Sequence, residues 1–104
     1  MLYAKTIPNV LTDLLIVPSD TEMAISTVFF CNTSETQYDD MTIYAVPSGG
    51  TAGDENVILL KVRIDPTDTF TMDTERIIMG AGDKLQAKSV YGTINSVVSA
   101  AVIS

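Results

Sequence analysis

Short apolar segments alternate with clusters of turn-forming residues along the whole chain. The segments expected to form strands are 2–7, 13–17, 23–31, 41–46, 57–64, 69–72, 76–79, 84–90 and 94–103. Clusters rich in Pro, Gly, Asp and Asn separate them, and only 8–15 favours a helical turn. About eight or nine short strands without intervening helices predict an all-β fold, an antiparallel β-sandwich of the jelly-roll kind.

The period within two segments predicts one buried and one exposed face. In 57–64, the alternation places Ile58, Leu60, Val62 and Ile64 on one face and Lys61 and Arg63 on the other. In 84–90, it places Leu85, Ala87 and Ser89 opposite Lys84, Gln86 and Lys88. A strict period of two is typical of antiparallel strands with one side toward a core.

Two other segments are apolar on both faces. In 23–31, the period places Ile25 and Phe29 on one face and Val28 and Phe30 on the other. In 94–103, it places Val97, Ala101 and Ile103 opposite Val98, Ala100 and Val102. Because a half-exposed antiparallel strand has one polar face, this pattern predicts that both faces are covered.

A second copy of the chain is the simplest cover for the outer face of these strands. We therefore expect a homo-oligomer, while covering loops or a central strand position are the alternatives. The candidate interface residues are Leu2, Tyr3, Phe30, Val97, Val98, Ala100 and Val102.

The length of 104 residues fits one domain. Residues 1–12 are expected to form an N-terminal arm or a first edge strand, and 13–104 a single β-sandwich domain. The net charge is −7, from 13 acidic against 6 basic residues, which argues against nucleic acid as a partner. Residues 1–55 hold eight of the acids and only one base, Lys5. They form either a solvated acidic rim or a face that meets a basic partner surface.

The cysteine content and the hydropathy of the chain indicate the cellular compartment in which we expect the protein. Cys31 is the single cysteine, so no intrachain disulfide can form, which fits a reducing cytoplasm or a particle assembled there. We expect Cys31 to be a small buried hydrophobe. Residues 1–10 do not resemble a secretory signal, and no apolar segment approaches the length of a membrane span.

The segment 47–56 is rich in Gly and ends in acidic residues, which makes it a candidate ligand site. A phosphate-binding loop requires a Lys after the last glycine and a following helix, but a strand follows Gly53. The spacing of Asp54, Glu55 and Asn56 is not that of an EF-hand. We expect a long strand connection, without a metal or a cofactor.

Catalytic chemistry has few candidates. The chain has no histidine, which removes the commonest general base and metal ligand. Asp39-Asp40 and Asp65 with Asp68 are candidate carboxylate pairs of the glycosidase type, but the chain has no tryptophan as a sugar platform. We expect a protein that is not an enzyme. Tyr3, Tyr38, Tyr44 and Tyr91 leave carbohydrate binding open as an alternative.

Several segments follow one another in a distinctive order along residues 13–103. A strand ending in IVP leads to one ending in CNTS, followed by VPSGGTAGDENVIL, AGDKLQAK and a closing INSVVSAAVIS. This order resembles that of small virion proteins of tailed bacteriophages, in which VPSGGsAGDxNxIL follows the second long strand and GDxLQAK comes near the end. The most specific pieces are 46–59 and 81–88, and segment 1–11 departs from the core pattern.

The resemblance implies a structural protein of the virion, assembled in the host cytoplasm. A capsid decoration or cement protein, with a trimer as the expected form, is the first expectation, and a tail, baseplate or fibre-attachment module is the alternative. The implied partners are further copies of the chain and other virion proteins, such as the major capsid or tail proteins. The resemblance supplies no catalytic residues.

Overall fold

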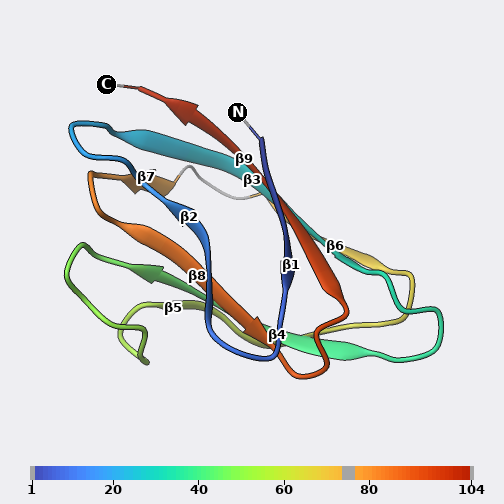
Figure 1. The fold of residues 1–104 in the computed structure, drawn as a ribbon. Coiled ribbons are helices and arrows are strands. Elements are labelled where there is room, and N and C mark those ends of the chain that lie inside the picture. Colours follow the sequence, from blue (N-terminus) through green and yellow to red (C-terminus); the bar gives the residue numbers. More distant parts are fainter. Residues whose placement is uncertain (1, 74–76, 104) are drawn as a thin grey trace.

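A computed structural model of the protein describes residues 2–73 and 77–103 and shows nine β-strands within them (Figure 1). The strands are β1 (Leu2–Ile7), β2 (Thr12–Ile16), β3 (Met23–Asn32), β4 (Asp39–Val46), β5 (Val57–Ile64), β6 (Thr69–Met72), β7 (Ile77–Met79), β8 (Lys84–Ser89) and β9 (Ile94–Val102). The described residues include no helix that could span a membrane.

The strands form two antiparallel sheets. Sheet A has the order β1-β9-β3-β6, with β7 also paired to β3, and sheet B has the order β2-β8-β4-β5. Since β6 pairs with residues 28–31 of β3 and β7 with residues 23–25, the two share one strand position. Each sheet thus has four positions, and the order is that of a jelly roll. The predicted antiparallel β-sandwich is confirmed.

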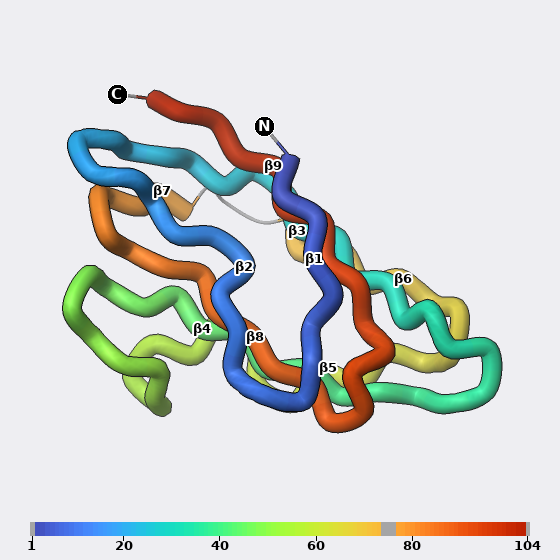
Figure 2. Tube along the Cα trace, viewed as in Figure 1, coloured from blue at the N-terminus to red at the C-terminus, as the bar shows by residue number. Residues whose placement is uncertain are grey.

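The N-terminal segment belongs to the sandwich. Strand β1 pairs with β9 from Leu2 to Ile7, and the chain then crosses to sheet B as β2 (Figure 2). Ile7 is fully buried, so residues 2–7 form an edge strand rather than a detached arm. The helical turn expected at 8–15 is wrong, because Thr12–Ile16 pairs with β8 as a strand. Arg76, the first residue of the strand expected at 76–79, lies outside the described residues.

The core lies between the two sheets and has Phe30 as its largest fully buried side chain. A bulge between Ile25 and Thr27 shifts the register of β3 against β9. Ile25, Val28 and Phe30 are therefore all buried, while Phe29 is 44% exposed. The prediction that Ile25 shares a face with Phe29 is wrong, because the extra residue reverses the alternation.

A second bulge changes the faces of β5. The pairing of β4 with β5 shifts between Met41 and Ile43, and Lys61 on the opposite strand has a φ of 50°. Leu60, predicted to face the core, is 63% exposed, so that prediction is wrong for the same reason. The prediction for β8 is confirmed, since Leu85, Ala87 and Ser89 are buried.

Asp83 joins the two sequence segments that carry the resemblance. Its carboxylate accepts hydrogen bonds from the backbone N–H of Ser48 (2.8 Å) and of Gly80 (2.9 Å). In the same turn, the Gly82 N–H donates to the Val17 carbonyl oxygen (2.9 Å). Asp83 therefore connects the turn that contains Gly80 and Gly82 to the turn that contains Pro47 and Ser48.

Gly82→Ala is expected to lower the free energy of unfolding by about 2 kcal/mol. Gly82 has a φ of +82°, and a Cβ there would clash with the side chain of Ser48. Urea denaturation of the two proteins measures the difference. Gly53→Ala is the matched control, because a Cβ at Gly53 would meet nothing within 4 Å; equal losses in both variants would contradict the prediction.

Candidate functional site

Three of the predicted interface residues lie in the core. Phe30 and Val98 are 0% exposed and Ala100 is 3% exposed. All three point inward from sheet A, where sheet B of the same chain covers them. Their assignment to an interface is wrong, because the apolar cover expected from a second copy is supplied by the second sheet.

The other predicted residues are accessible to different degrees. Leu2 is 71% exposed, Val97 is half-buried, and Val102 is 53% exposed at the end of β9. Tyr3 is partly buried and packs against the core. The structure brings Leu2 and Val97 together on the outer face of sheet A, because Leu2 pairs with Ser99 and Ala4 with Val97.

The outer face of sheet A presents a continuous row of small and apolar side chains. Ala4 pairs with Val97, Val97 with Phe29, and Phe29 with Thr71, so one row crosses four strands. Neighbouring rows follow from the same registers and complete this face with Leu2, Thr6, Ser26, Thr27, Cys31, Thr69, Ile78, Asn95, Ser99 and Ala101. Phe29 is the largest side chain of this face and is 44% exposed. Sequence reasoning missed it, because the bulge in β3 decides which of two adjacent phenylalanines faces outward.

None of the described strand residues on this outer face is charged. Asp73, which follows β6, lies at the border of the face, where its carboxylate accepts a hydrogen bond from the Thr27 hydroxyl (3.4 Å). The scarcity of charge is unusual in a chain with 13 acidic and 6 basic residues. A partner can cover an uncharged face without burying an unpaired charge.

The size of the face suits an interface between proteins. Strand β9 has 9 residues, so four strands offer a surface of roughly 30 by 19 Å, about 600 Å² per copy. Two such faces together reach the lower limit of stable protein interfaces, about 1,200 Å² in total.

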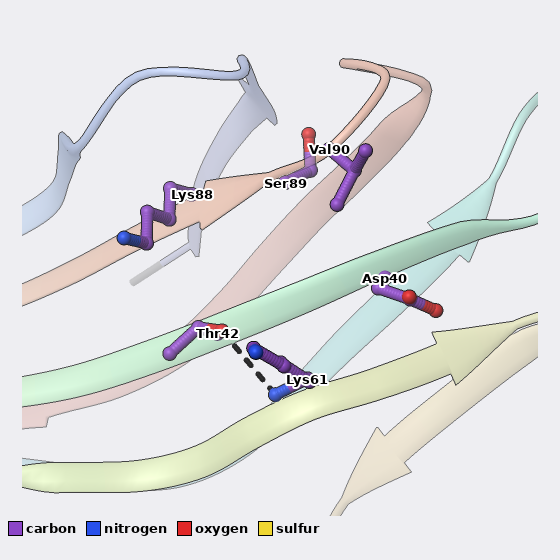
Figure 3. A pocket seen from close by; sticks show the side chains of 6 residues that line it. All are labelled: Asp40, Thr42, Lys61, Lys88, Ser89 and Val90. Atoms are coloured by element: carbon purple, nitrogen blue, oxygen red, sulfur yellow. Dashed lines mark hydrogen bonds between the residues drawn. The ribbon is translucent and has the colours of Figure 1, made fainter.

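The opposite outer face, on sheet B, carries a cleft of about 280 Å³ (Figure 3). Its lining residues are Asp40, Thr42, Lys61, Lys88, Ser89 and Val90. They come from β4, β5, β8 and the first residue after β8. The outer faces of the two sheets therefore differ in chemistry: the strands of one lack charge and the other concentrates cations.

Asp39 is a buried carboxylate that sequence reasoning took for part of the acidic rim. It is 0% exposed. Its Oδ1 accepts from the backbone N–H of Val90 and Tyr91 (3.0 Å each), and its Oδ2 from the N–H (3.0 Å) and hydroxyl (3.1 Å) of Thr93. Asp39 thus holds the turn between β8 and β9. Its position in phase with the apolar Met41 and Ile43 is the sequence signal that could have revealed it.

The pKa of the Asp39 carboxyl lies below its ordinary value of 3.8. Burial by itself raises the pKa of this carboxyl. The hydrogen bonds from the backbone N–H groups of Thr93, Tyr91 and Val90 and from the Thr93 hydroxyl together lower the pKa by more than burial raises it. The carboxylate therefore remains ionised in the fold and serves the turn.

The candidate carboxylate pairs do not converge on a shared site. Asp40 points away from the core and pairs with Arg63 (3.3 Å), whose guanidinium lies over the Tyr38 ring (3.9 Å). Asp65 and Asp68 close a turn in which the Asp68 N–H donates to the Asp65 carbonyl oxygen (3.1 Å). Asp39 binds the β8–β9 turn, Asp40 pairs with Arg63, and Asp65 and Asp68 belong to a turn of their own.

The side chain of Asn56 stabilises the 47–56 loop through two hydrogen bonds. Its side-chain oxygen accepts from the Gly53 N–H (3.0 Å) and its amide donates to the Thr51 carbonyl oxygen (2.9 Å). The Gly50 N–H donates to the Pro47 carbonyl oxygen (2.9 Å) in a tight turn. Asn56, a candidate calcium ligand, is therefore used by the backbone of the loop.

Cys31 and the tyrosines are also placed by the fold. Cys31, expected to be buried, is half-buried on the outer face of sheet A. Tyr38 and Tyr91 form an edge-to-face pair at 6.0 Å, while Tyr3 and Tyr44 lie on β1 and β4. Of the four rings, the pair of Tyr38 and Tyr91 is thus the one that the structure brings together.

Comparisons of the chain with protein-family models, with curated proteins and with solved structures find no match.

Proposed function

We propose that this protein is a non-enzymatic structural component of a tailed-phage virion, an oligomeric capsid decoration or cement protein. Its partners are further copies of itself and the major capsid protein, and it joins the particle in the host cytoplasm. The observation that carries the proposal is the outer face of sheet A, which is centred on Phe29 and Val97 and has no charged residue on its described strands.

The physical role follows from that face. A decoration protein stabilises a shell by binding the assembled state in many copies, so each contact shifts the equilibrium toward the intact particle. An uncharged face of short side chains on paired strands buries area at a low cost in side-chain ordering. The order of segments that resembles small phage virion proteins supports the same role, and jelly rolls recur among viral capsid domains. The fold contributes only by analogy.

Localisation in the particle tests this proposal. We expect cryo-electron microscopy of the virion to place the protein on the head in many copies, in register with the capsid lattice. A few copies that follow tail symmetry would contradict the cement role and favour a tail, baseplate or fibre module. Absence from the virion together with specific binding on a glycan array would favour carbohydrate recognition instead.

Phe29→Asp is expected to weaken self-association about 100-fold or more, because the carboxylate would be buried in a face without a counter-charge. Phe29 is 44% exposed, so the fold of the monomer should persist. Sedimentation velocity over a concentration series measures the effect. Val10→Asp is the control, since Val10 is 62% exposed in the connection between β1 and β2, away from both outer faces; equal losses in both variants would show that association does not use the outer face of sheet A.

A further inference from the structure

The cleft on sheet B contains cations without ionic partners. Among the described residues, Arg63 pairs with Asp40 and the Lys5 ammonium donates to the Asp13 carbonyl oxygen. Lys61 and Lys88 make no ion pair there, and both line the cleft. Figure 3 shows them on either side of Thr42.

The backbone of Lys61 has an unfavourable conformation. Its φ of 50° lies in the left-handed region, which a lysine rarely adopts and which glycine or asparagine would occupy more easily. The Lys61 N–H donates to Thr42 Oγ1 (3.2 Å), which fixes the bulge against β4. The bulge thus turns Lys61 out of the alternation of β5 and fixes the point from which its side chain leaves the backbone.

The cleft offers hydrogen-bond donors in excess of acceptors. Thr42 is 5% exposed, and its oxygen accepts from Lys61, while no described residue accepts its hydroxyl hydrogen. The Ser89 hydroxyl is occupied by the Ile7 carbonyl oxygen (2.9 Å). The carboxylate at one end, on Asp40, is neutralised by Arg63. Two ammonium groups and one hydroxyl hydrogen thus remain for an anionic ligand.

We propose that this cleft binds the carboxylates of Asp54 and Glu55 from a second copy of the chain. The inference rests on the proposed function, because it requires copies to lie side by side in an assembly. Lysine ammonium groups act as point charges without a fixed fork, so each of the two can pair with a separate carboxylate. A volume of about 280 Å³ suits side chains rather than a large ligand.

Asp54 and Glu55 are suited to this role by their loop. Both are exposed, neither makes an ion pair among the described residues, and they lie within the braced segment next to Asn56. The hydrogen bonds of Asn56 order the loop before binding, which reduces the entropy lost on docking. In Figure 1 the loop extends from the β4 and β5 ends at the edge of sheet B.

The loop is separated from the cleft of its own chain. Lys61 lies four residues after Val57, where β5 begins, a distance of roughly 13 Å along the strand. A contact between the loop of one copy and the cleft of the next joins two different surfaces. Such head-to-tail contacts close into rings or extend into arrays. The contact also gives the uneven charge distribution a role, with the acids of the first half meeting bases of the second.

A charge-swap experiment tests the contact. At low salt, K61E/K88E and D54K/E55K are each expected to weaken oligomer formation about tenfold or more, as measured by native mass spectrometry of mass-labelled copies. An equimolar mixture of the two variants is expected to restore mixed oligomers, because each loop meets a cleft of opposite charge wherever two unlike copies are neighbours. A ring with an even number of copies would alternate in composition, whereas a trimer would keep one contact between like copies. K84E, a cation on the same strand as Lys88 but outside the cleft, and E22K/E35K, acids in other loops, serve as controls and should associate like the parent.

Other outcomes would overturn the inference. Failure of the mixture to restore association, or full association of D54K/E55K alone, would exclude this loop as the occupant. Binding of polygalacturonate by the parent but not by K61E/K88E, without rescue in the mixture, would assign the cleft to an acidic glycan. If the protein occupies the virion but the swap fails, only the cleft contact is wrong; if the swap succeeds and the virion lacks the protein, only the proposed function is wrong.

Discussion

Asp39→Ala is expected to lower the free energy of unfolding by about 4 kcal/mol. The side chain is 0% exposed, and its loss would leave the N–H groups of Tyr91 and Thr93 without an acceptor. The Val90 N–H would lose one of its two acceptors and keep the Asp40 carbonyl oxygen (3.1 Å). A small domain has a total stability of about 5–15 kcal/mol, so this loss is a large share of the total. Urea denaturation followed by circular dichroism measures the loss.

Asp40→Ala is the matched control for this prediction. Asp40 is the next residue, but its side chain points outward and forms an exposed pair with Arg63. Exposed pairs contribute about 0–1 kcal/mol, so this variant should unfold near the parent. Similar losses for the two variants would contradict the role of Asp39 in holding the β8–β9 turn.

The same carboxylate gives a pH dependence with a defined sign. The pKa of Asp39 in the fold lies below 3.8, whereas in the unfolded chain it is about 3.9. Its stabilisation is present above the unfolded pKa and is lost as the pH falls through the lower folded pKa. We therefore expect the parent to lose more stability than Asp39→Asn between about pH 5 and pH 3. Parallel stability curves for the two proteins would contradict this.

Phe30→Ala is expected to cost about 3–5 kcal/mol, whereas Phe29→Ala should cost about 1 kcal/mol or less. Phe30 is 0% exposed, and its ring packs near that of Phe70, with centroids 6.4 Å apart. Its truncation would leave a cavity between the sheets. Phe29 lies on the outer face and is 44% exposed.

Denaturation of both alanine variants at a concentration where the parent is monomeric separates folding from association. The comparison is a direct test of the bulge in β3, because without it the period from Ile25 would place Phe29 inward. A larger loss of stability for Phe29→Ala than for Phe30→Ala would show that the register is different. Phe30→Leu should lose less than Phe30→Ala, because it fills more of the cavity.

The local sequence pattern was sufficient to predict where the strands lie, but it was not sufficient to predict which side of β3 and β5 faces the core. Turn clusters at 18–20, 47–56 and 80–83 interrupt the apolar segments, so strand ends could be placed within about two residues. The faces of β8 followed the period of two, because its pairing with β4 is unbroken and the shift in its pairing with β2 inserts the extra residue into β2, between Asp13 and Leu15. Those of β3 and β5 did not, because each pairing contains a bulge.

The candidate sites show a similar division. Strand β9 was recognised as apolar on both faces, but a second sheet of the same chain covers Val98 and Ala100, and Val97 alone of the three faces outward. The hydrogen bonds of Asp39 reach residues more than 50 positions away. Lys61 and Lys88 reach one cleft only because β4 lies between β5 and β8.

Composition and short-range periodicity were enough to specify an acidic, all-β chain without histidine, since these properties depend on residue types and neighbouring positions. The uncharged strands on the outer face of sheet A, the buried Asp39 and the cationic cleft arise from strand order and from the bulges. These depend on contacts between residues far apart in the chain, where one inserted residue reverses which side chains meet the core and which meet solvent.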